Sequence, residues 1–445
     1  MYPRSYYIIA AFTLAQLLLL LIFGYTPYPD SDGYILLAEE SIAHGEPYPV
    51  TSLLNIYPFL WNAGAVNAAA LSLRLFHSVT PLLIVYCLMK GATAWFLWRI
   101  TRHLFNDKTA FVALLLYVIY PANYGEGTSA LSELPFMFFI MAGIYFCLLR
   151  RQNLLGGMSI ALANWFRPMG IVYLSAIIIY LLTTHRHSIR EAFKRHSIKA
   201  IVQHRSIKIV VSPLAGYLLM IAIIGGLTYH RTGLFLYQAK TGWMALTDYS
   251  TNHSPKSLSV RDHTEWNVAQ KDSAWQSLFI EWVKQHPTEY ARQMPKKLVD
   301  TYVSDNVNMC AFVPDKDKKS YIYDEVSMPT LLHTFPRWSP VQWLTLTNLL
   351  VYLSLLLAAT GSLIYLKKRS DAHHSKKNAY TFKKSSYLLS LSVILLGTLL
   401  LLFAGHGEAR FHIPFMPFII MLAAVFIANT IKTTANTIKT EEKKT

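Results

Sequence analysis

The sequence predicts an all-α polytopic membrane protein with about ten transmembrane helices. Apolar residues make up 53% of the 445 residues, and charged residues only 15%. The apolar residues fall in long blocks, not in the short periodic stretches typical of a soluble core. The loops between these blocks also alternate in their content of Lys and Arg, as expected of a multi-pass chain.

Ten apolar blocks are candidates for the spans. The first block follows Arg4 and ends without a small-residue cleavage site, which indicates a retained signal anchor. Several other blocks are shorter than the ~20 residues that a bilayer core requires, so they need independent support. The blocks are residues 6–25, 81–98, 109–120, 130–149, 154–165, 169–182, 209–229, 341–366, 387–403 and 411–431.

The distribution of basic residues supplies that support. If the N-terminus is cytoplasmic, the cytoplasmic segments are 99–108, 150–151, 186–208, 367–384 and the tail from 432, and each is basic. The outer loops at 120–129, 164–168 and 404–412 contain no basic cluster. A single span through Arg167 and Pro168 would place the basic cluster at 186–208 outside. We therefore expect two spans there, in a protein of the plasma or inner membrane.

The net charge of +16 is explained by this topology and by anionic lipids, so we expect membrane lipids, and no nucleic acid, as partners.

The order of the apolar blocks divides the chain into three parts. Residues 1–229 form an N-terminal transmembrane module that includes a first outer loop at 27–80. Residues 230–340 form an extracytoplasmic domain of helices and loops. Residues 341–445 form the C-terminal transmembrane helices and a cytoplasmic tail.

Three amphipathic helices are expected outside the spans, two in the first outer loop and one in the extracytoplasmic domain, and an apolar stripe is identified in two of them. The first, in the first outer loop, carries an apolar stripe and ends near His44. The second lies in the extracytoplasmic domain and ends at His286-Pro287. This second helix either packs on its own domain or lies flat on the membrane, and both alternatives stay open here. The stripes are Tyr34, Leu37, Ala38, Ser41 and Ile42 in the first helix, and Trp275, Leu278, Phe279, Trp282 and Val283 in the second.

Asp30 and Asp32 stand at the start of the first amphipathic helix. The helix dipole favours ionised carboxylates there, and the alternative role, an N-cap and its neighbour, would explain one or both of them. Further ionisable groups are predicted at the same face of the membrane, where such groups are costly and are read as functional. These are Glu133, Arg167, Glu408 and Arg410, whereas Glu126, in a Gly-rich loop, is expected to be a solvated acid.

This combination of groups points to chemistry on a phosphorylated substrate at the outer leaflet. A carboxylate can act as a general base, and a guanidinium can bind phosphate through paired hydrogen bonds. Snorkelling to the interface is the alternative role for Arg167 and Arg410. His44, His406 and His412 show no metal-ligand spacing. We expect no metal ligands among these residues, with an assisting divalent ion left as an open alternative.

Five stretches resemble the polytopic GT-C glycosyltransferases, in particular the bacterial relatives of protein O-mannosyltransferases and of the lipid A aminoarabinose transferase. The first is PDSDGYILLAEESIAHGEPY, in which Asp30, Tyr34 and Ala38 fit the family's spacing in its first outer loop. The family's Asp-Glu pair is replaced here by Asp30-Ser31, followed by Asp32. The other stretches are YPFLWNAGAVNAAALSLRLFHSVTP, SALSELPFMFFIMAGIYF with Glu133, NWFRPMGIVYL with Arg167, and GEARFHIPFMPFII with Arg410.

The resemblance implies a GT-C-like fold and transfer of a sugar from a polyprenyl-phosphate donor to a glycan, lipid or protein acceptor, with inversion and at the outer face. It implies an aspartate base, Asp30 or Asp32, with donor and phosphate contacts from Arg410, Arg167, Glu133, Glu408 and Tyr34. Alternatives are a lipid or oligosaccharide transporter or flippase, and an O-antigen-type polymerase or ligase. A transporter should show matched halves around a site at the membrane midplane, and we see neither.

Overall fold

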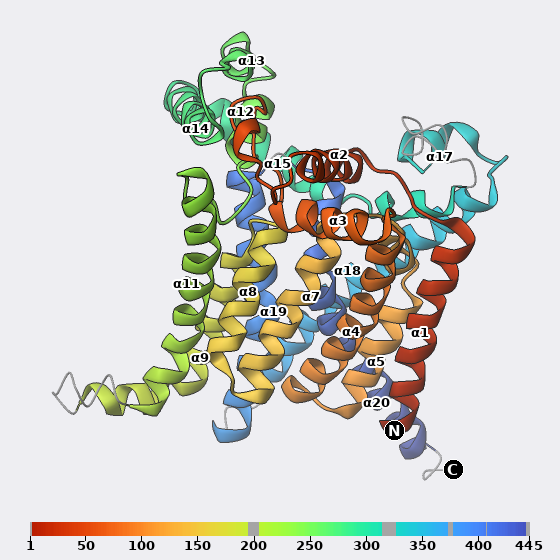
Figure 1. The fold of residues 1–445 in the computed structure, drawn as a ribbon. Coiled ribbons are helices and arrows are strands. Elements are labelled where there is room, and N and C mark those ends of the chain that lie inside the picture. The colour runs from red at the N-terminus through yellow and green to blue at the C-terminus, as the bar shows by residue number, and fades with distance from the viewer. Residues whose placement is uncertain (1, 195–203, 314–325, 373–376, 406, 442–445) are drawn as a thin grey trace.

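The computed structural model describes residues 2–194, 204–313, 326–372, 377–405 and 407–441. This part of the chain is 81% helical and contains no strand, only an isolated antiparallel bridge between Leu60 and Lys240. Figure 1 shows a bundle of long helices with shorter helices gathered over one of its ends. The all-α fold class predicted from the sequence is therefore confirmed.

Ten helices correspond in order to the ten apolar blocks. Seven are long and apolar enough to cross a membrane, in some cases together with an adjoining turn, and these are α1, α4, α7, α11, α18, α19 and α20. The multi-pass prediction is thus confirmed. The bounds are α1 Tyr2–Phe23, α4 Thr80–Leu104, α5 Asp107–Ile119, α7 Glu133–Tyr145, α8 Asn153–Phe166, α9 Gly170–Phe193, α11 Arg205–Thr232, α18 Pro340–Ala372, α19 Lys377–Ala404 and α20 Met416–Glu441.

The bundle has an enclosed centre and an exposed periphery. The most apolar stretch of the α20 span is 78% buried and that of α7 is 72% buried, whereas that of α1 is 17% buried. Helices α8 and α11 pack backbone to backbone, because a Cβ at Gly157 would lie 1.8 Å from the carbonyl oxygen of Pro213. Small residues at such contacts let membrane helices approach closely. The charged side chains of the candidate site lie at one end of this bundle.

The chain turns between α8 and α9, as the charge pattern predicts. Helix α8 ends at Phe166 and α9 begins at Gly170. The side chain of Asn164 accepts a hydrogen bond from the backbone N–H of Gly170 at 3.1 Å, which closes the turn. Arg167 has an extended backbone in this turn, so its side chain lies at the end of the bundle and not within a continuous helix.

Two amphipathic helices, α2 (Pro29–Ala43) and α3 (Ala63–Phe76), lie across one end of the bundle. The α2 stripe is buried as predicted, except that Ile42 is 37% exposed. Helix capping, the alternative role for the two aspartates, does not account for either of them. The N-cap residue is Tyr28, and its backbone N–H donates to the Ser31 hydroxyl. Both aspartates of the first turn are therefore available for contacts outside the helix.

The region between α11 and α18 forms a cap of short helices at the same end of the bundle (Figure 1). Part of the predicted apolar face of α14 packs within the cap, because Trp275 is fully buried and its indole donates to the Ser257 carbonyl at 3.1 Å. The elements of the cap are α12 Gly242–Ser250, α13 Pro255–Asp262, α14 Val268–Gln285, α15 Pro287–Tyr302, η4 Val307–Phe312 and α17 Met328–Thr334.

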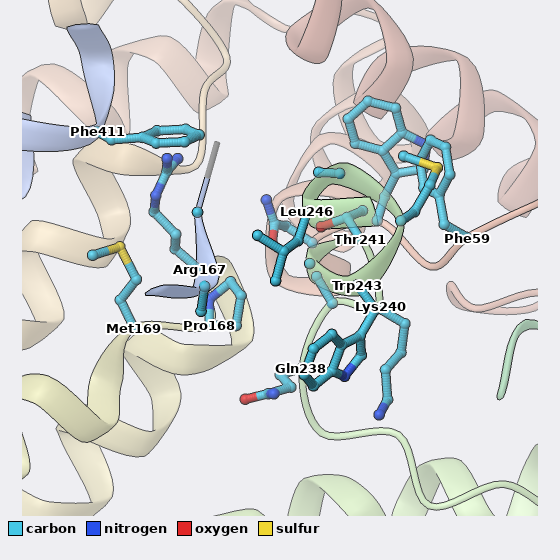
Figure 2. A pocket seen from close by; sticks show the side chains of 18 of the residues that line it. Phe59, Arg167, Pro168, Met169, Gln238, Lys240, Thr241, Trp243, Leu246 and Phe411 are labelled. Carbon is cyan, nitrogen blue, oxygen red and sulfur yellow. The ribbon is translucent and has the colours of Figure 1, made fainter. Parts of the chain in front are cut away.

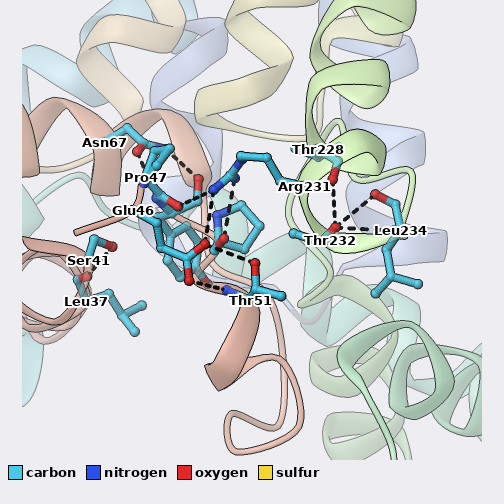
Figure 3. Close-up of polar contacts among 12 residues, drawn as sticks. Leu37, Ser41, Glu46, Pro47, Thr51, Asn67, Thr228, Arg231, Thr232 and Leu234 are labelled. Carbon is cyan, nitrogen blue, oxygen red and sulfur yellow. Dashed lines mark hydrogen bonds and ion pairs between the residues drawn. The ribbon is translucent and has the colours of Figure 1, made fainter. Parts of the chain in front are cut away.

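A polar clamp at the end of α11 holds the first outer loop (Figure 3). The Arg231 guanidinium donates to the carbonyl of Pro47 at 2.8 Å and lies 3.6 Å from the Glu46 carboxylate. Glu46 in turn accepts hydrogen bonds from the backbone N–H and hydroxyl of Thr51, both at 2.9 Å. The loop between α2 and α3 is thereby attached to the bundle.

Candidate active site

A cavity of about 430 Å³ opens where the bundle end, α2 and the cap meet (Figure 2). Its volume lies within the range of ~300–1,000 Å³ typical of small-molecule sites. Seven segments distant in sequence contribute to it: α2, the loop before α3, the turn between α8 and α9, the segment that leads into α12 with the start of that helix, α14, the end of α19, and η5 (Ala409–Phe415). The charged and tyrosine side chains in its lining are Asp30, Tyr34, Arg167, Lys240, Asp272 and Arg410.

Arg410 is the centre of the charged end of the cavity. Its Nη1 lies 2.8 Å from Oδ2 of Asp30, and its Nε lies 2.7 Å from Oε1 of Glu408. The Arg410 side chain is only 12% exposed, so these ion pairs are screened less than surface pairs would be. The turn that holds Arg410 therefore brings the start of the last helix to the start of α2.

A second ion pair adjoins the first. Arg167 Nη1 donates to Glu133 Oε1 at 2.6 Å, and both side chains are buried. The same Glu133 oxygen lies 4.0 Å from Arg410 Nη1, so one carboxylate bridges the two guanidinium groups. The ring of Phe411 lies near both, with centroid distances of 5.1 Å to Arg167 and 6.0 Å to Arg410. In the described part of the chain, Nε and Nη2 of Arg167 make no hydrogen bond and remain available to a ligand.

Tyr34 connects this cluster to the cavity wall. The Asn62 amide donates to the Tyr34 hydroxyl at 2.7 Å, and the hydroxyl donates to Ser132 at 3.4 Å. Ser132 donates onward to Glu133 at 3.2 Å. Burial, and secondarily the nearby Asp30 carboxylate, raise the pKa of Tyr34 well above its ordinary value, so it acts as a hydrogen-bonding group and not as a base. Asn62 and Ser132 are not predicted from the sequence, because isolated polar residues near apolar segments carry little signal.

The two aspartates of α2 lie in different surroundings. Asp30 lines the cavity beside Arg410. Asp32 does not line the cavity, and it accepts a hydrogen bond from the Tyr25 hydroxyl at 3.0 Å. Burial raises the pKa of Tyr25 above its ordinary range, which keeps this phenol a donor. The geometry thus favours Asp30 over Asp32 as the carboxylate that can meet a substrate.

The histidines considered as metal ligands make other contacts. The ring Nδ1 of His44 lies 2.9 Å from the Glu40 carbonyl, and Nδ1 of His412 lies 2.7 Å from the Thr301 carbonyl. His406 lies outside the described residues. Within the ranges that the structure describes, no group of three or more His, Cys, Asp or Glu side chains could hold a metal ion.

Glu126 is not the solvated acid that the sequence suggests. Its side chain is only 10% exposed, and it forms an ion pair with Lys90 in α4, a lysine that is also buried. Asn308 donates to the same carboxylate at 3.4 Å. The prediction was wrong because a charged lysine inside a span needs a nearby counter-charge, and Glu126 provides it. The signal was present in the sequence, since Lys90 is a lone cation in the apolar block at 81–98.

A comparison with models of known protein families finds a match within this chain. The family model described as dolichyl-phosphate-mannose-protein mannosyltransferase matches residues 66–230. This range includes Glu133 and Arg167 but neither Asp30 nor Arg410. Over this part of the chain, the match confirms the similarity to GT-C membrane glycosyltransferases inferred from the motifs. No curated protein matches the chain.

Among solved structures, two crystal structures of ArnT from Cupriavidus metallidurans align with most of the chain. The structure bound to undecaprenyl phosphate is 12% identical and covers 95% of this chain and 77% of its own, with a TM-score of 0.35. The apo structure is 10% identical and covers 94% of this chain and 76% of its own, with the same TM-score.

Proposed function

We propose that this protein transfers a sugar from a polyprenyl-phosphate donor to an acceptor hydroxyl at the outer face of the plasma or inner membrane, with inversion at the anomeric carbon. One observation carries the proposal: the Asp30 carboxylate and the Arg410 guanidinium meet in a cavity at one end of a membrane bundle. A carboxylate base and a phosphate-binding cation are the two groups that this reaction needs within one site.

The family match supports the class of donor. The name of the matched family specifies dolichyl-phosphate-mannose, a lipid phosphate that carries a sugar. A lipid-linked donor holds its phosphate near the membrane interface, and its hydrocarbon chain stays among the spans. The cavity lies at the end of the bundle, beside the amphipathic α2 and α3, where such a phosphate would be presented.

In the proposed reaction, Asp30 accepts the proton of the acceptor hydroxyl. The acceptor oxygen then forms a bond to the anomeric carbon, and the bond from that carbon to the phosphate oxygen breaks. Its electron pair leaves with polyprenyl phosphate. Arg410 and Arg167 bind the phosphate and stabilise the charge that develops on it. Asp32 is assigned a supporting role, because its contact with Tyr25 fixes the first turn of α2.

The remaining side chains position these groups. Glu133 bridges the two guanidinium groups, and Glu408 holds Nε of Arg410, so both arginines keep a fixed orientation. Tyr34 connects to Glu133 through Ser132. The carboxylates of the cluster are already in ion pairs with the two arginines, so they are not free to serve as ligands of a resident divalent ion. Turnover is therefore expected to be unchanged by EDTA.

The test uses purified protein in lipid nanodiscs, supplied with polyprenyl-phosphate sugars of several kinds. Wild type should release polyprenyl phosphate from at least one donor, and Arg410→Ala should lose donor binding. Lys256→Ala, an exposed lysine in α13, is a control that should bind the donor as wild type does. Normal donor binding by Arg410→Ala would refute the assigned phosphate site.

A further inference from the structure

The cavity has two chemically different sides. Figure 2 shows Arg167 and Phe411 on one side and Trp243 and Phe59 on the other. The first side belongs to the charged cluster. The second is formed by Phe59 and Trp61 from the loop before α3 and by Trp243 from the start of α12. We call these three residues the aromatic wall. The proposed function as stated above gives this wall no role.

The aromatic wall presents surface that the protein itself leaves partly uncovered. All three rings are partly exposed although they line a concave site. In the described part of the chain, neither indole N–H of Trp61 and Trp243 donates a hydrogen bond. An aromatic face carries partial negative charge, and it attracts the polarised C–H groups on one face of a sugar ring. The indole N–H groups can also donate to hydroxyl oxygens.

The polar groups beside the wall also fit a hydroxyl-rich ligand. Oδ1 of Asn62 is buried and accepts no hydrogen bond. Gln238 accepts from Asn164 at 2.7 Å, which leaves its amide N–H₂ as a donor. Lys240 is paired with Asp272 at 3.1 Å, so its charge is compensated within the protein. Separate donors and acceptors without an unpaired charge suit hydroxyls, which both donate and accept, better than a charged headgroup or an acyl chain.

The wall is held in place before any ligand binds. The backbone N–H of Trp61 donates to the Tyr48 hydroxyl at 3.0 Å, and the neighbouring Tyr48 backbone is bound by Asn67. The backbone N–H of Lys240 donates to the Leu60 carbonyl at 2.8 Å, which joins the loop before α3 to the segment before α12. Preorganised side chains lose less entropy on binding, so this arrangement is suited to recognition.

We propose that the aromatic wall is a subsite for a saccharide acceptor, an inference that rests on the proposed function. In an inverting transfer, the acceptor oxygen attacks the anomeric carbon from the face opposite the departing phosphate. Asp30, the proposed base, lies beside Arg410, so the acceptor hydroxyl reaches Asp30 while the rest of the acceptor extends across the cavity to the wall. The acceptor class is thereby a glycan, in preference to a protein side chain or a lipid amine.

The test measures saccharide binding without requiring turnover. Saturation-transfer NMR is recorded on the full chain in nanodiscs with methyl glycosides of glucose, galactose, mannose and N-acetylglucosamine. Wild type should saturate the ring protons of at least one glycoside. Trp243→Ala should weaken that binding by about tenfold or more, because it removes one stacking face. Trp243→Phe keeps an aromatic face and should retain most of the binding. Trp266→Ala, outside the cavity lining, is the matched control.

Each outcome decides the inference. Binding that is lost in Trp243→Ala but kept in Trp243→Phe and Trp266→Ala supports the subsite. No saturation of any glycoside, or equal binding by wild type and Trp243→Ala, overturns it. In a separate assay, release of polyprenyl phosphate is compared with glycosides, serine-containing peptides or phosphatidylethanolamine as acceptors. If only a peptide or the lipid accelerates release, the saccharide subsite is refuted while the glycosyltransferase proposal survives. Release of polyprenyl phosphate from the donor, without any saccharide binding, would likewise refute the saccharide subsite and leave the glycosyltransferase proposal intact.

Discussion

Arg410 and Asp30 lie at opposite ends of the sequence, yet Nη1 of one is 2.8 Å from Oδ2 of the other. The contact forms because η5 leads into α20 at the bundle end over which α2 lies. It joins the proposed base to the proposed phosphate ligand. The same guanidinium lies 4.0 Å from Glu133, so the two arginines and their acids form one connected cluster.

Arg410→Lys tests whether the guanidinium geometry matters beyond its charge. Lysine keeps the positive charge but loses the planar fork that binds a phosphate and two carboxylates together. We expect donor affinity to fall by about tenfold to a hundredfold, a loss of ~1.4–2.8 kcal/mol. The measurement is titration of the variant with polyprenyl phosphate in nanodiscs, alongside wild type. Unchanged affinity would show that Arg410 contributes charge only.

The Lys90–Glu126 pair should be structural. Lys90→Met or Glu126→Gln alone leaves a buried charge without its partner, at a typical cost of about 3–5 kcal/mol. The double variant removes both charges and should regain most of the lost stability. Thermal unfolding of the purified variants in detergent provides the comparison. If the loss of stability in the double variant equals the sum of the losses in the two single variants, the ion pair is not the cause of the losses in the single variants.

Lys297 should make stability depend on alkaline pH. Its side chain is buried between the rings of Tyr249 and Tyr290, and burial lowers its pKa from 10.5 to about 8. Between these values the unfolded chain binds a proton that the folded chain has lost. The free energy of unfolding therefore rises as the pH increases from about 8 towards 10.5.

The check on Lys297 is a difference between variants, because other groups titrate in the same range. Lys297→Met should lack this rise relative to wild type in unfolding experiments across that pH range. Lys296→Met is the matched control, since Lys296 is exposed and paired with Asp300 at 2.6 Å. A rise that persists in Lys297→Met would assign the pH dependence to another group.

The outer location of the cavity can be tested by cysteine labelling. Lys256 is exposed in the cap, and Lys108 is exposed near the start of α5, in a segment predicted to be cytoplasmic. Lys256→Cys should react in intact cells with an impermeant thiol reagent, and Lys108→Cys should react only after lysis. The native Cys87, Cys147 and Cys310 are buried, so background labelling should be low. The reverse pattern would place the cavity in the cytoplasm.

The helices were predictable from the sequence because apolar length and loop charge each depend on local composition. The separation of α8 from α9 around Arg167 is an example, since the charge of a later loop decided it. The Lys90–Glu126 pair could also have been predicted from the sequence, because a single lysine in an apolar block needs a nearby carboxylate to balance its charge.

The internal geometry of the site was not predictable in the same way. The motifs place Asp30 and Arg410 at one membrane face, but their contact depends on how η5 packs against α2, and no local pattern encodes that packing. The segment with Gln238 and Trp243 shows neither periodicity nor a charge cluster, so its place in the cavity emerges only from the fold.

The most direct test of the proposed reaction is the release of polyprenyl phosphate by wild type and by Asp30→Asn, with Asp32→Asn as the matched control. Asp30→Asn keeps the shape of the side chain but cannot accept the proton, so turnover should fall by about 10²-fold to 10⁴-fold with donor binding retained. Asp32→Asn should keep most of the activity. Full activity in Asp30→Asn, or loss confined to Asp32→Asn, would contradict the assignment of Asp30 as the base. Absence of turnover with every donor in wild type would instead favour a transporter or a polymerase.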